Sequence, residues 1–332
     1  MTKSFVHLHA HTEYSMLDGA AKIVDYLKKV KELNQPAAAI TDHGNLYGAM
    51  EFVQKANDLG IKPIIGYEAY ITPGSRFDRP DRENNKRYHL TLLAENNIGY
   101  QNLVELVSKA YTEGYYYKPR IDYELLDQHH DGLIALSGCL GGELAQHLAP
   151  DGSVEEGNTS NERSFEKALD IAKKYQSIFG KENYFIEIHN HGIKQQLDIL
   201  DDLVEIAELI DAPLVAANDS HYVEENGAEA HDALLCVQTN RTLDDESRFR
   251  FDGSGYYVKS AEEMRKLFPE DKYPGACDNT LAIANRVNYE FNFDNSYLPD
   301  FPIEDKNVSP EELLKIKVYE GGERKYGTLT SE

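Results

Sequence analysis

Residues 7–19 of the chain read HLHAHTEYSMLDG. Histidines stand at every second position of its first part, a period that is typical of a β-strand, in which alternate side chains share a face. His7, His9 and His11 are therefore predicted to point the same way. Because imidazole is the commonest metal ligand in proteins, the pattern predicts a row of metal ligands. Three exposed strand histidines are the alternative.

Strand and helix patterns alternate along the rest of the chain. Besides a strand at 5–9, short apolar runs typical of strands lie at 37–41, 63–71, 88–94, 132–136, 184–188 and 213–217. Segments with helical spacing separate most of them, at 20–33, 46–59, 100–111, 164–179 and 195–210. Seven strands in this α/β order predict a parallel sheet or a closed barrel. A doubly wound open sheet is the competing arrangement.

Side chains that can bind metal recur where these strands end. They are Asp42 and His43, Glu68, Cys139, and Asp219 with His221. A single carboxylate at a strand end, such as Asp42, is more commonly a helix cap. Recurrence at these four strand ends, together with the histidines of the first strand, instead favours a metal centre at the carboxyl edge, where βα barrels collect functional groups. His89 is the exception, because it lies near the start of its strand.

Cys139 lies in the sequence SGCLGG after the fifth strand. A lone cysteine is more commonly a small buried apolar residue. A nucleophile elbow fits poorly, since that motif requires glycine where this chain has Ser137. A thiolate ligand beside histidines fits better, and it favours a borderline-soft ion such as zinc over magnesium.

Composition narrows the classes of function. The 332 residues include 34 Lys and Arg against 57 Asp and Glu, a net charge of −23. Such a chain cannot hold nucleic acid by a broad basic surface, so phosphate chemistry must be local or use the charge of bound metal. Three cysteines are too few and too scattered for a disulfide framework. Without a signal peptide or a long apolar run, we expect a cytosolic protein with no membrane partner.

The motifs, taken in order, carry a family resemblance. The segments HLHAHTEYSMLDG, ITDHGNLYGA, KPIIGYEAY, YHLTLLAENNIGYQNL, YYYKPRID, GLIALSGCLGGEL and NDSHYV resemble the polymerase-and-histidinol-phosphatase (PHP) domain of bacterial DNA polymerase III alpha subunits. The resemblance covers about residues 4–300. It implies a distorted (β/α)7 barrel with a cluster of two to three divalent metal ions, Zn, Mn or Fe, at the carboxyl ends of the strands.

The resemblance also implies the ligand set. Matched motif by motif, the ligands are His9, His11, Asp18, His43, Glu68, His89, Cys139, Asp219 and His221. All nine positions hold a competent ligand, which implies an active metal-dependent 3′–5′ exonuclease that proofreads DNA, with His9, His11, Asp219 and His221 as its catalytic residues. Three carboxylates and a thiolate contribute −4 and three divalent ions +6, which leaves +2 to face a phosphodiester.

The implied partners are DNA, through the 3′ end of a primer strand, and the rest of a polymerase alpha chain with its replisome subunits. Candidate substrate contacts are Arg76, Lys118, Arg120 and His191, although such basic residues are more commonly solvated surface charges. His189 is a candidate second-sphere or substrate group.

Residues 1–285 are expected to form the barrel, and 286–332 a linker and the start of a polymerase palm region, with an amphipathic helix at 311–320. The polymerase active site would then lie outside this fragment. Two other functions stay open, a small-molecule phosphatase of the histidinol-phosphatase type and a scaffold in which metal is structural. The palm-like tail argues against the first, and an open coordination position would argue against the second.

Overall fold

The computed structural model describes residues 4–16, 18–150, 162–291, 293, 298 and 301–328. The chain divides into two compact units, Met1–Tyr289 and Glu290–Glu332. This division lies close to the predicted boundary between residues 285 and 286. The assignment of the second unit to a polymerase palm stays a prediction.

A curled mixed sheet forms the centre of the first unit. Its strands follow the order β1-β2-β3-β5-β6-β7, with the short β4 paired to β2. Their bounds are β1 Ala37–Ile40, β2 Lys62–Ile71, β3 Tyr88–Ala94, β4 Arg120–Ile121, β5 Leu133–Leu136, β6 Tyr184–Ile188 and β7 Leu214–Ala216. Strand β3 runs antiparallel to both of its neighbours, β2 and β5, and the other pairs are parallel. The prediction of an all-parallel sheet is therefore wrong for β3.

The extended N-terminal segment closes the sheet into a barrel. On one side the Ala39 amide donates to the His7 carbonyl at 3.0 Å and the Thr41 amide donates to the Ala10 carbonyl at 2.9 Å. On the other side the His11 amide donates to the carbonyl of Ser220, beyond β7, at 2.8 Å. The segment predicted as the first strand thus occupies the seventh strand position of the barrel, although its hydrogen bonds are too sparse for a regular strand. The predicted distorted (β/α)7 barrel is confirmed.

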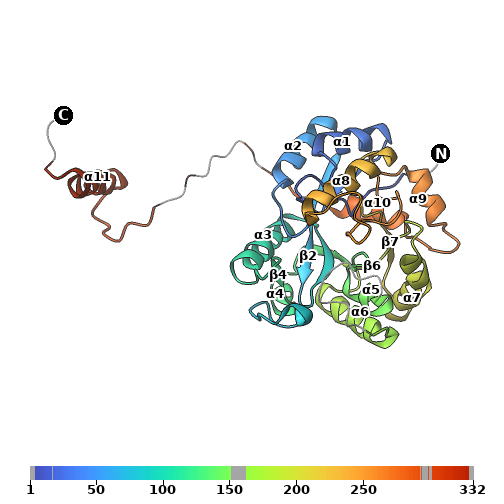
Figure 1. Ribbon diagram of the computed structural model, residues 1–332. Helices are drawn as coiled ribbons and strands as arrows, with labels where there is room; N and C mark the ends of the chain where they lie inside the picture. Colours follow the sequence, from blue (N-terminus) through green and yellow to red (C-terminus); the bar gives the residue numbers. More distant parts are fainter. Residues whose placement is uncertain are drawn as a thin grey trace. The chain divides into compact units, whose positions relative to one another are not determined.

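Helices surround these strands, as Figure 1 shows. The five helices expected from spacing are present as α1 Ile23–Glu32, α2 Ala49–Leu59, α3 Asn97–Thr112, α6 Phe165–Phe179 and α7 Lys194–Ile210. Elements that the spacing did not predict are α4 Tyr123–Gln128, α5 Glu143–Leu148, α8 Ala228–Thr239, α9 Ala261–Leu267, α10 Asp278–Arg286 and the 3-10 turns Arg82–Asn84 and Glu225–Gly227. Most of these are too short for a periodic pattern to stand out.

The apolar core occupies the end of the barrel opposite to the carboxyl ends of its parallel strands. Ala37 of β1, Ile64 of β2 and Phe185 of β6 all come from the first halves of their strands and belong to one buried cluster. Ile283 of α10 and Val287, directly after this helix, belong to the same cluster. Apolar packing therefore fills one end, and the other end is left to the polar residues that follow the strands.

The described part of the second unit contains α11, Pro310–Tyr326. Ser309 and Glu312 form a capping box at its start, which explains where the helix begins. Its apolar residues Leu314, Ile316 and Val318 are exposed. The predicted helix is present and longer than expected.

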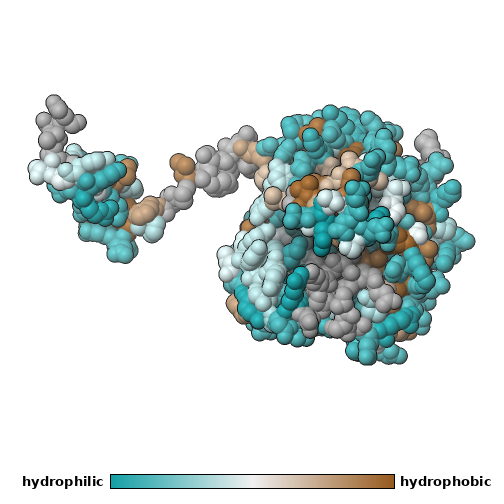
Figure 2. All heavy atoms as spheres, in the orientation of Figure 1, coloured by the Kyte–Doolittle hydropathy of each residue, from teal (hydrophilic) through white to brown (hydrophobic). Residues whose placement is uncertain are grey.

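The surface of the first unit is polar over most of the face seen in Figure 2. Among the described residues no helix is both long and apolar enough to cross a membrane.

Candidate metal centre

All nine predicted ligands lie at one end of the barrel. His9 and His11 come from the extended N-terminal segment, and Asp18 comes from the turn after it. The other six lie within or directly after the strands β1, β2, β3, β5 and β7. His89 stands at the start of β3 and still reaches this end. The reason is that β3 is antiparallel, so it begins where the parallel strands finish.

Glu68 is the central carboxylate of the group. It is buried, and its Oε1 lies 3.2 Å from His9 Nε2 and 3.0 Å from His89 Nδ1. Its Oε2 lies 2.5 Å from His43 Nδ1. One carboxylate therefore faces three imidazoles from three different segments.

Two further carboxylates face the remaining histidines. Asp219 Oδ1 lies 3.1 Å from His11 Nε2 and 3.4 Å from His9 Nε2. Asp18 Oδ2 lies 3.2 Å from His43 Nε2. The His11 ring stacks against those of His43 and His221, with centroids 4.1 and 4.3 Å away. Such close approach of carboxylate oxygens to imidazole nitrogens requires a proton or a metal ion between them.

The donor atoms at this centre are poorly satisfied by the protein itself. Within the described residues, the following buried atoms have no hydrogen-bond partner: His9 Nε2, His11 Nε2, Asp18 Oδ1, His43 Nδ1, Glu68 Oε2, Asp219 Oδ1 and His221 Nε2. Several of them face one another as ion pairs, such as His43 Nδ1 and Glu68 Oε2, and each such contact needs a proton or a metal ion between the two atoms. The triplets His11–His43–His221, His9–His11–Asp219 and His43–Glu68–His89 each bring three donor atoms within 4.8 Å of one another. The donor set fits divalent cations.

Electrostatics hold these groups in charged pairs when protons are the only cations. Burial opposes protonation of His43, but Asp18 and Glu68 outweigh it and raise its pKa to about 10. Burial likewise opposes ionisation of Glu68, yet the neighbouring histidines hold its pKa well below the usual value. For His221, burial and then His11 lower the pKa to about 4. A bound metal ion would take the place of the proton on His43.

Cys139 lies at the edge of the group. Its Sγ is 3.6 Å from Glu68 Oε1 and 3.7 Å from His89 Nδ1, and it accepts a hydrogen bond from the Gly141 amide at 3.4 Å. Burial, followed by the charges of Glu68 and Asp219, raises the pKa of its thiol well above normal. The thiolate form therefore needs a cation beside it.

Glu187 is a buried residue of this centre that sequence reasoning missed. Its Oε1 lies 2.7 Å from His9 Nδ1 and 3.0 Å from His189 Nε2, and the Gly138 amide donates to its Oε2 at 2.9 Å. The available signal was a charged residue inside the otherwise apolar strand YFIEI. A carboxylate on the far nitrogen of an imidazole fixes the tautomer that leaves the near nitrogen for metal.

The sequence left two roles open for Asp42, a helix cap and a metal ligand, and its contacts correspond to neither role. It accepts hydrogen bonds from the Ser15 hydroxyl at 2.6 Å and from the amide and hydroxyl of Thr12. The Ser15 hydroxyl in turn lies 2.9 Å from His11 Nδ1. Asp42 thus orients His11 through Ser15.

His7 departs from the predicted row of three imidazoles. Its Nε2 donates to the Lys259 carbonyl at 2.9 Å, and its ring meets Phe5 edge-on. It belongs to none of the metal-binding triplets among the described residues. The strand geometry assumed for residues 7–11 is too irregular to keep all three side chains on one face.

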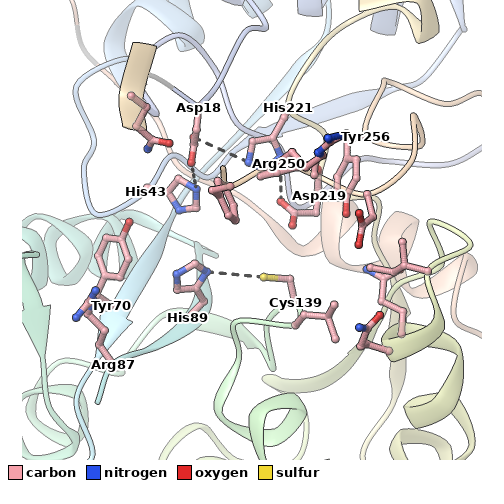
Figure 3. A pocket seen from close by; sticks show the side chains of 18 of the residues that line it. Asp18, His43, Tyr70, Arg87, His89, Cys139, Asp219, His221, Arg250 and Tyr256 are labelled. Carbon is pink, nitrogen blue, oxygen red and sulfur yellow. Dashed lines mark hydrogen bonds and ion pairs between the residues drawn. The ribbon is translucent and has the colours of Figure 1, made fainter. Parts of the chain in front are cut away.

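A cavity of about 420 Å³ opens onto the centre. Asp18, His43, His89, Cys139, Asp219 and His221 line it, and Figure 3 shows them facing the same space. Three cationic side chains, Arg87, Lys118 and Arg250, line it as well. The cavity thus combines carboxylates and histidines, which can bind metal ions, with cationic side chains. This combination favours an anionic ligand that also contacts the bound metal.

The four predicted substrate contacts differ in whether their side chains line the cavity. Lys118 lines the cavity, where its Nζ donates to the Tyr70 hydroxyl at 3.1 Å. Arg76 pairs with Glu113 and Asp122, and Arg120 is fully buried with hydrogen bonds to internal carbonyls, so both predictions are wrong. His191 donates from Nε2 to the Asn218 carbonyl at 2.8 Å and does not line the cavity. Sequence reasoning did not identify Arg87 and Arg250 as residues that line the cavity.

The chain matches the PHP domain family over residues 7–191, more than half of its length. The chain belongs to the PHP family. The predicted family and PHP fold are thereby confirmed. The matched range contains seven of the nine predicted ligands, and Asp219 and His221 lie beyond it.

Among curated proteins, the PHP domain is similar to DNA polymerase III alpha subunits. It is 46% identical to that of Saccharopolyspora erythraea over 307 residues, which cover 86% of this chain and 25% of that protein. It is 45% identical to that of Thermus aquaticus over 324 residues, which cover 94% of this chain and 25% of that protein. The chain thus spans about a quarter of the length of these relatives.

Among solved structures, a two-domain protein from Bacteroides vulgatus that contains a predicted PHP-like metal-dependent phosphoesterase aligns with a TM-score of 0.38. The two chains are 11% identical, and the alignment covers 79% of this chain and 62% of that one.

Proposed function

We propose that this PHP domain is a metal-dependent 3′–5′ exonuclease that removes the terminal nucleotide of a DNA strand. The observation that carries the proposal is the buried cluster of facing imidazoles and carboxylates, in which seven described atoms lack a hydrogen bond, beneath a cavity with three cationic side chains. A cluster of this kind needs cations, and a cationic wall above it selects an anionic substrate. A purely structural site would be closed by its ligands, whereas this one opens to a cavity.

Divalent ions, two to three of Zn, Mn or Fe, held by the nine ligands would activate water at neutral pH and stabilise charge on a phosphodiester. Water adds to the phosphorus of the terminal linkage, and the bond from phosphorus to the 3′ oxygen of the preceding nucleotide breaks. That oxygen takes a proton, so the products are a 5′-mononucleotide and a strand with a new 3′ hydroxyl.

The residues around the centre have separate tasks in this reaction. Glu187 holds His9 by Nδ1, and Ser15 with Asp42 holds His11, so that both Nε2 atoms face the centre. Arg87 and Lys118 bind phosphate oxygens on one wall of the cavity. The lining residues Leu140 and Ile193 limit access of bulk water.

The resemblance to polymerase alpha subunits supports the biological setting that we propose. The substrate is then the 3′ end of a primer strand, and residues 286–332 lead into the rest of a cytosolic polymerase chain that works with replisome subunits. The net charge of −23 leaves local cations and metal to hold DNA, which agrees with a site that binds only a strand end.

A substrate comparison tests the proposal. The 332-residue chain, loaded with Mn or Zn, is incubated with 3′-labelled single-stranded DNA and separately with histidinol phosphate. Release of labelled mononucleotide that a chelator abolishes supports the exonuclease. Preference for the phosphomonoester would assign a small-molecule phosphatase, and full metal loading without either activity would assign a scaffold.

A further inference from the structure

The segment 248–252, RFRFD, follows α8 and forms one wall of the cavity over the metal centre. Phe249, Arg250, Phe251 and Asp252 line this cavity. The last three also line a second cavity of about 380 Å³, which lies against α8. The segment therefore separates two hollows and presents side chains to both.

An ion pair anchors the start of this wall. Arg248 is buried, and its two terminal nitrogens donate to the two carboxylate oxygens of Asp232 on α8 at 2.6 and 2.5 Å. Such bidentate pairs fix both distance and orientation. The backbone that carries residues 249–251 is thus held to a helix.

Phe251 fixes the middle of the wall against the metal centre. Its ring centroid lies 4.7 Å from His221, 4.9 Å from His231 and 4.7 Å from Tyr256. His231 donates from Nε2 to the Asp18 carbonyl at 2.7 Å, so the wall also packs against the support of a second ligand. The position of the wall relative to the ligands is therefore well determined.

Phe249 and Arg250 flank this fixed residue and remain accessible. Phe249 is 39% exposed, with its ring 5.7 Å from that of Phe251. Arg250 is exposed, and no hydrogen bond or ion pair to it is found in the described part of the chain. Figure 3 shows Arg250 beside Tyr256 and His221, whereas Arg87 lies with Tyr70 on the other side of His89. An aromatic face and a guanidinium thus adjoin one another within reach of the metal centre.

We propose that Phe249 and Arg250 bind the terminal nucleotide of an unpaired DNA 3′ end, Phe249 by stacking on the base and Arg250 by contact with the phosphate. The inference rests on the proposed function and narrows its substrate class to single-stranded ends. Bases stack on exposed aromatic side chains in sequence-tolerant DNA sites. A guanidinium is the side chain best suited to phosphate oxygens.

The dimensions and charges of the two cavities favour a single-stranded DNA 3′ end as the substrate. A cavity of about 420 Å³ gives room for a terminal nucleotide, and a base that has left the duplex can enter such a pocket. The second hollow, unlike the first, is lined by Glu229, whose carboxylate repels a phosphate backbone, whereas Asp232 in the same hollow is paired with Arg248. The rest of the strand is therefore directed over the opposite wall, toward Lys118.

Binding measurements with two matched probes test the inference. Both are fluorescent single-stranded dodecathymidylates with a hydrolysis-resistant terminal phosphorothioate linkage, and one lacks its 3′-terminal base. The full 332-residue chain is titrated in Mn²⁺ by anisotropy. Phe249→Ala should weaken binding of the complete probe about tenfold and leave the abasic probe nearly unchanged. Arg250→Gln should weaken both probes several-fold and lower the salt dependence by about one phosphate contact.

Two exposed residues of the loop that precedes this segment serve as matched controls. Leu243 is 52% exposed and Arg241 is paired with Asp245 at 3.1 Å, and neither lines the cavity. Leu243→Ala and Arg241→Gln should bind both probes as the parent does. Far-UV circular dichroism verifies that all four variants are folded.

The outcomes separate this inference from the proposed function. Parent-like binding of both probes by Phe249→Ala and Arg250→Gln, or no binding of either probe by the parent, overturns the inference. Hydrolysis of bis(4-nitrophenyl) phosphate by the parent shows in either case that the centre cleaves phosphodiesters. If the parent cleaves neither this diester nor DNA, the exonuclease proposal fails, while the binding results still decide the roles of Phe249 and Arg250.

Discussion

The carboxylate of Glu187 lies 2.7 Å from Nδ1 of His9, and both side chains are fully buried inside the barrel. This contact directs the other ring nitrogen, Nε2, toward Glu68 at 3.2 Å and Asp219 at 3.4 Å. Burial opposes ionisation of Glu187, but His9 and His189 outweigh it and lower its pKa to about 2. Glu187 is therefore ionised and acts as the acceptor that orients His9.

Replacing Glu187 by Gln should weaken metal binding about 10–100-fold, the usual effect of removing a carboxylate behind a histidine ligand. The fold should persist, because the substitution keeps the shape of the side chain. Isothermal titration of the metal-free variant with Zn²⁺ measures the effect. Glu205→Gln, on the exposed side of α7, is the matched control and should bind like the parent. Equal affinities of both variants would remove Glu187 from the metal site.

The metal-free protein should lose stability as the pH rises. The folded-state pKa of His43 is raised to about 10 from 6.5, since Asp18 and Glu68 favour its protonated form. Its stabilising contribution is then fully present below pH 6.5 and is lost as the pH rises through about 10. In the presence of a chelator, the midpoint temperature of thermal unfolding should decrease as the pH is raised from 6.5 to about 10. The His43→Gln variant should show a smaller decrease over the same pH range. A pH-independent midpoint in the parent would contradict the ion pairs described.

Metal binding should release protons and strengthen with pH over the same range. His43 must lose a proton to bind metal, and so must the Cys139 thiol, whose pKa burial raises. Calorimetric titration at pH 7 in buffers of different ionisation enthalpy counts the released protons. Metal affinity that stays constant between pH 5 and pH 9 would speak against these residues as ligands.

Cys139→Ser should change metal preference more than it changes stability. A thiolate favours zinc over harder ions, so we expect the variant to lose far more affinity for Zn²⁺ than for Mn²⁺. Cys277→Ser, a buried cysteine far from the site in sequence, is the control. Proportional losses for both ions would place Cys139 outside the coordination sphere.

Arg120 and Lys118 should respond to mutation in opposite ways. Arg120 is fully buried and donates to the carbonyls of Gly114 at 3.1 Å and Asp78 at 2.7 Å. Arg120→Ala should lower the free energy of unfolding by about 3 kcal/mol, because buried acceptors lose a charged donor. Lys118→Ala should change it by less than about 1 kcal/mol and instead weaken binding of single-stranded DNA. Denaturant unfolding and anisotropy measure the two effects, and the reverse pattern would restore Arg120 as a DNA contact.

The strands, and the convergence of the nine predicted ligand residues at one end of the barrel, could be predicted because their signals are local. The apolar runs at 88–94 and 184–188 coincide with β3 and β6. The segment 72–86 before β3 has no helical pattern, and a parallel crossover usually contains one, so the sequence favoured an antiparallel β3. Glu187 was missed because a charged residue in a buried strand carries no sign of its partner.

The walls of the cavity could not be predicted by the same means. Phe249, Arg250 and Phe251 belong to a loop without periodicity, and their positions follow from contacts with residues on α8 and after β7. Arg120 illustrates the converse error. It lies in a two-residue strand too short to show a pattern, so a buried arginine resembled a surface charge.

The central claim is that the clustered ligands form a hydrolytic metal centre, and one paired measurement tests it most directly. Metal content by elemental analysis and release of the 3′-terminal nucleotide from single-stranded DNA are determined for the parent and for the His9→Ala, His11→Ala double variant at matched helical content. We predict that the parent binds at least two ions per chain and releases the nucleotide in a chelator-sensitive reaction. The variant should lose both metal and cleavage. Equal cleavage by the two proteins, or a fully loaded parent without cleavage, would contradict the account.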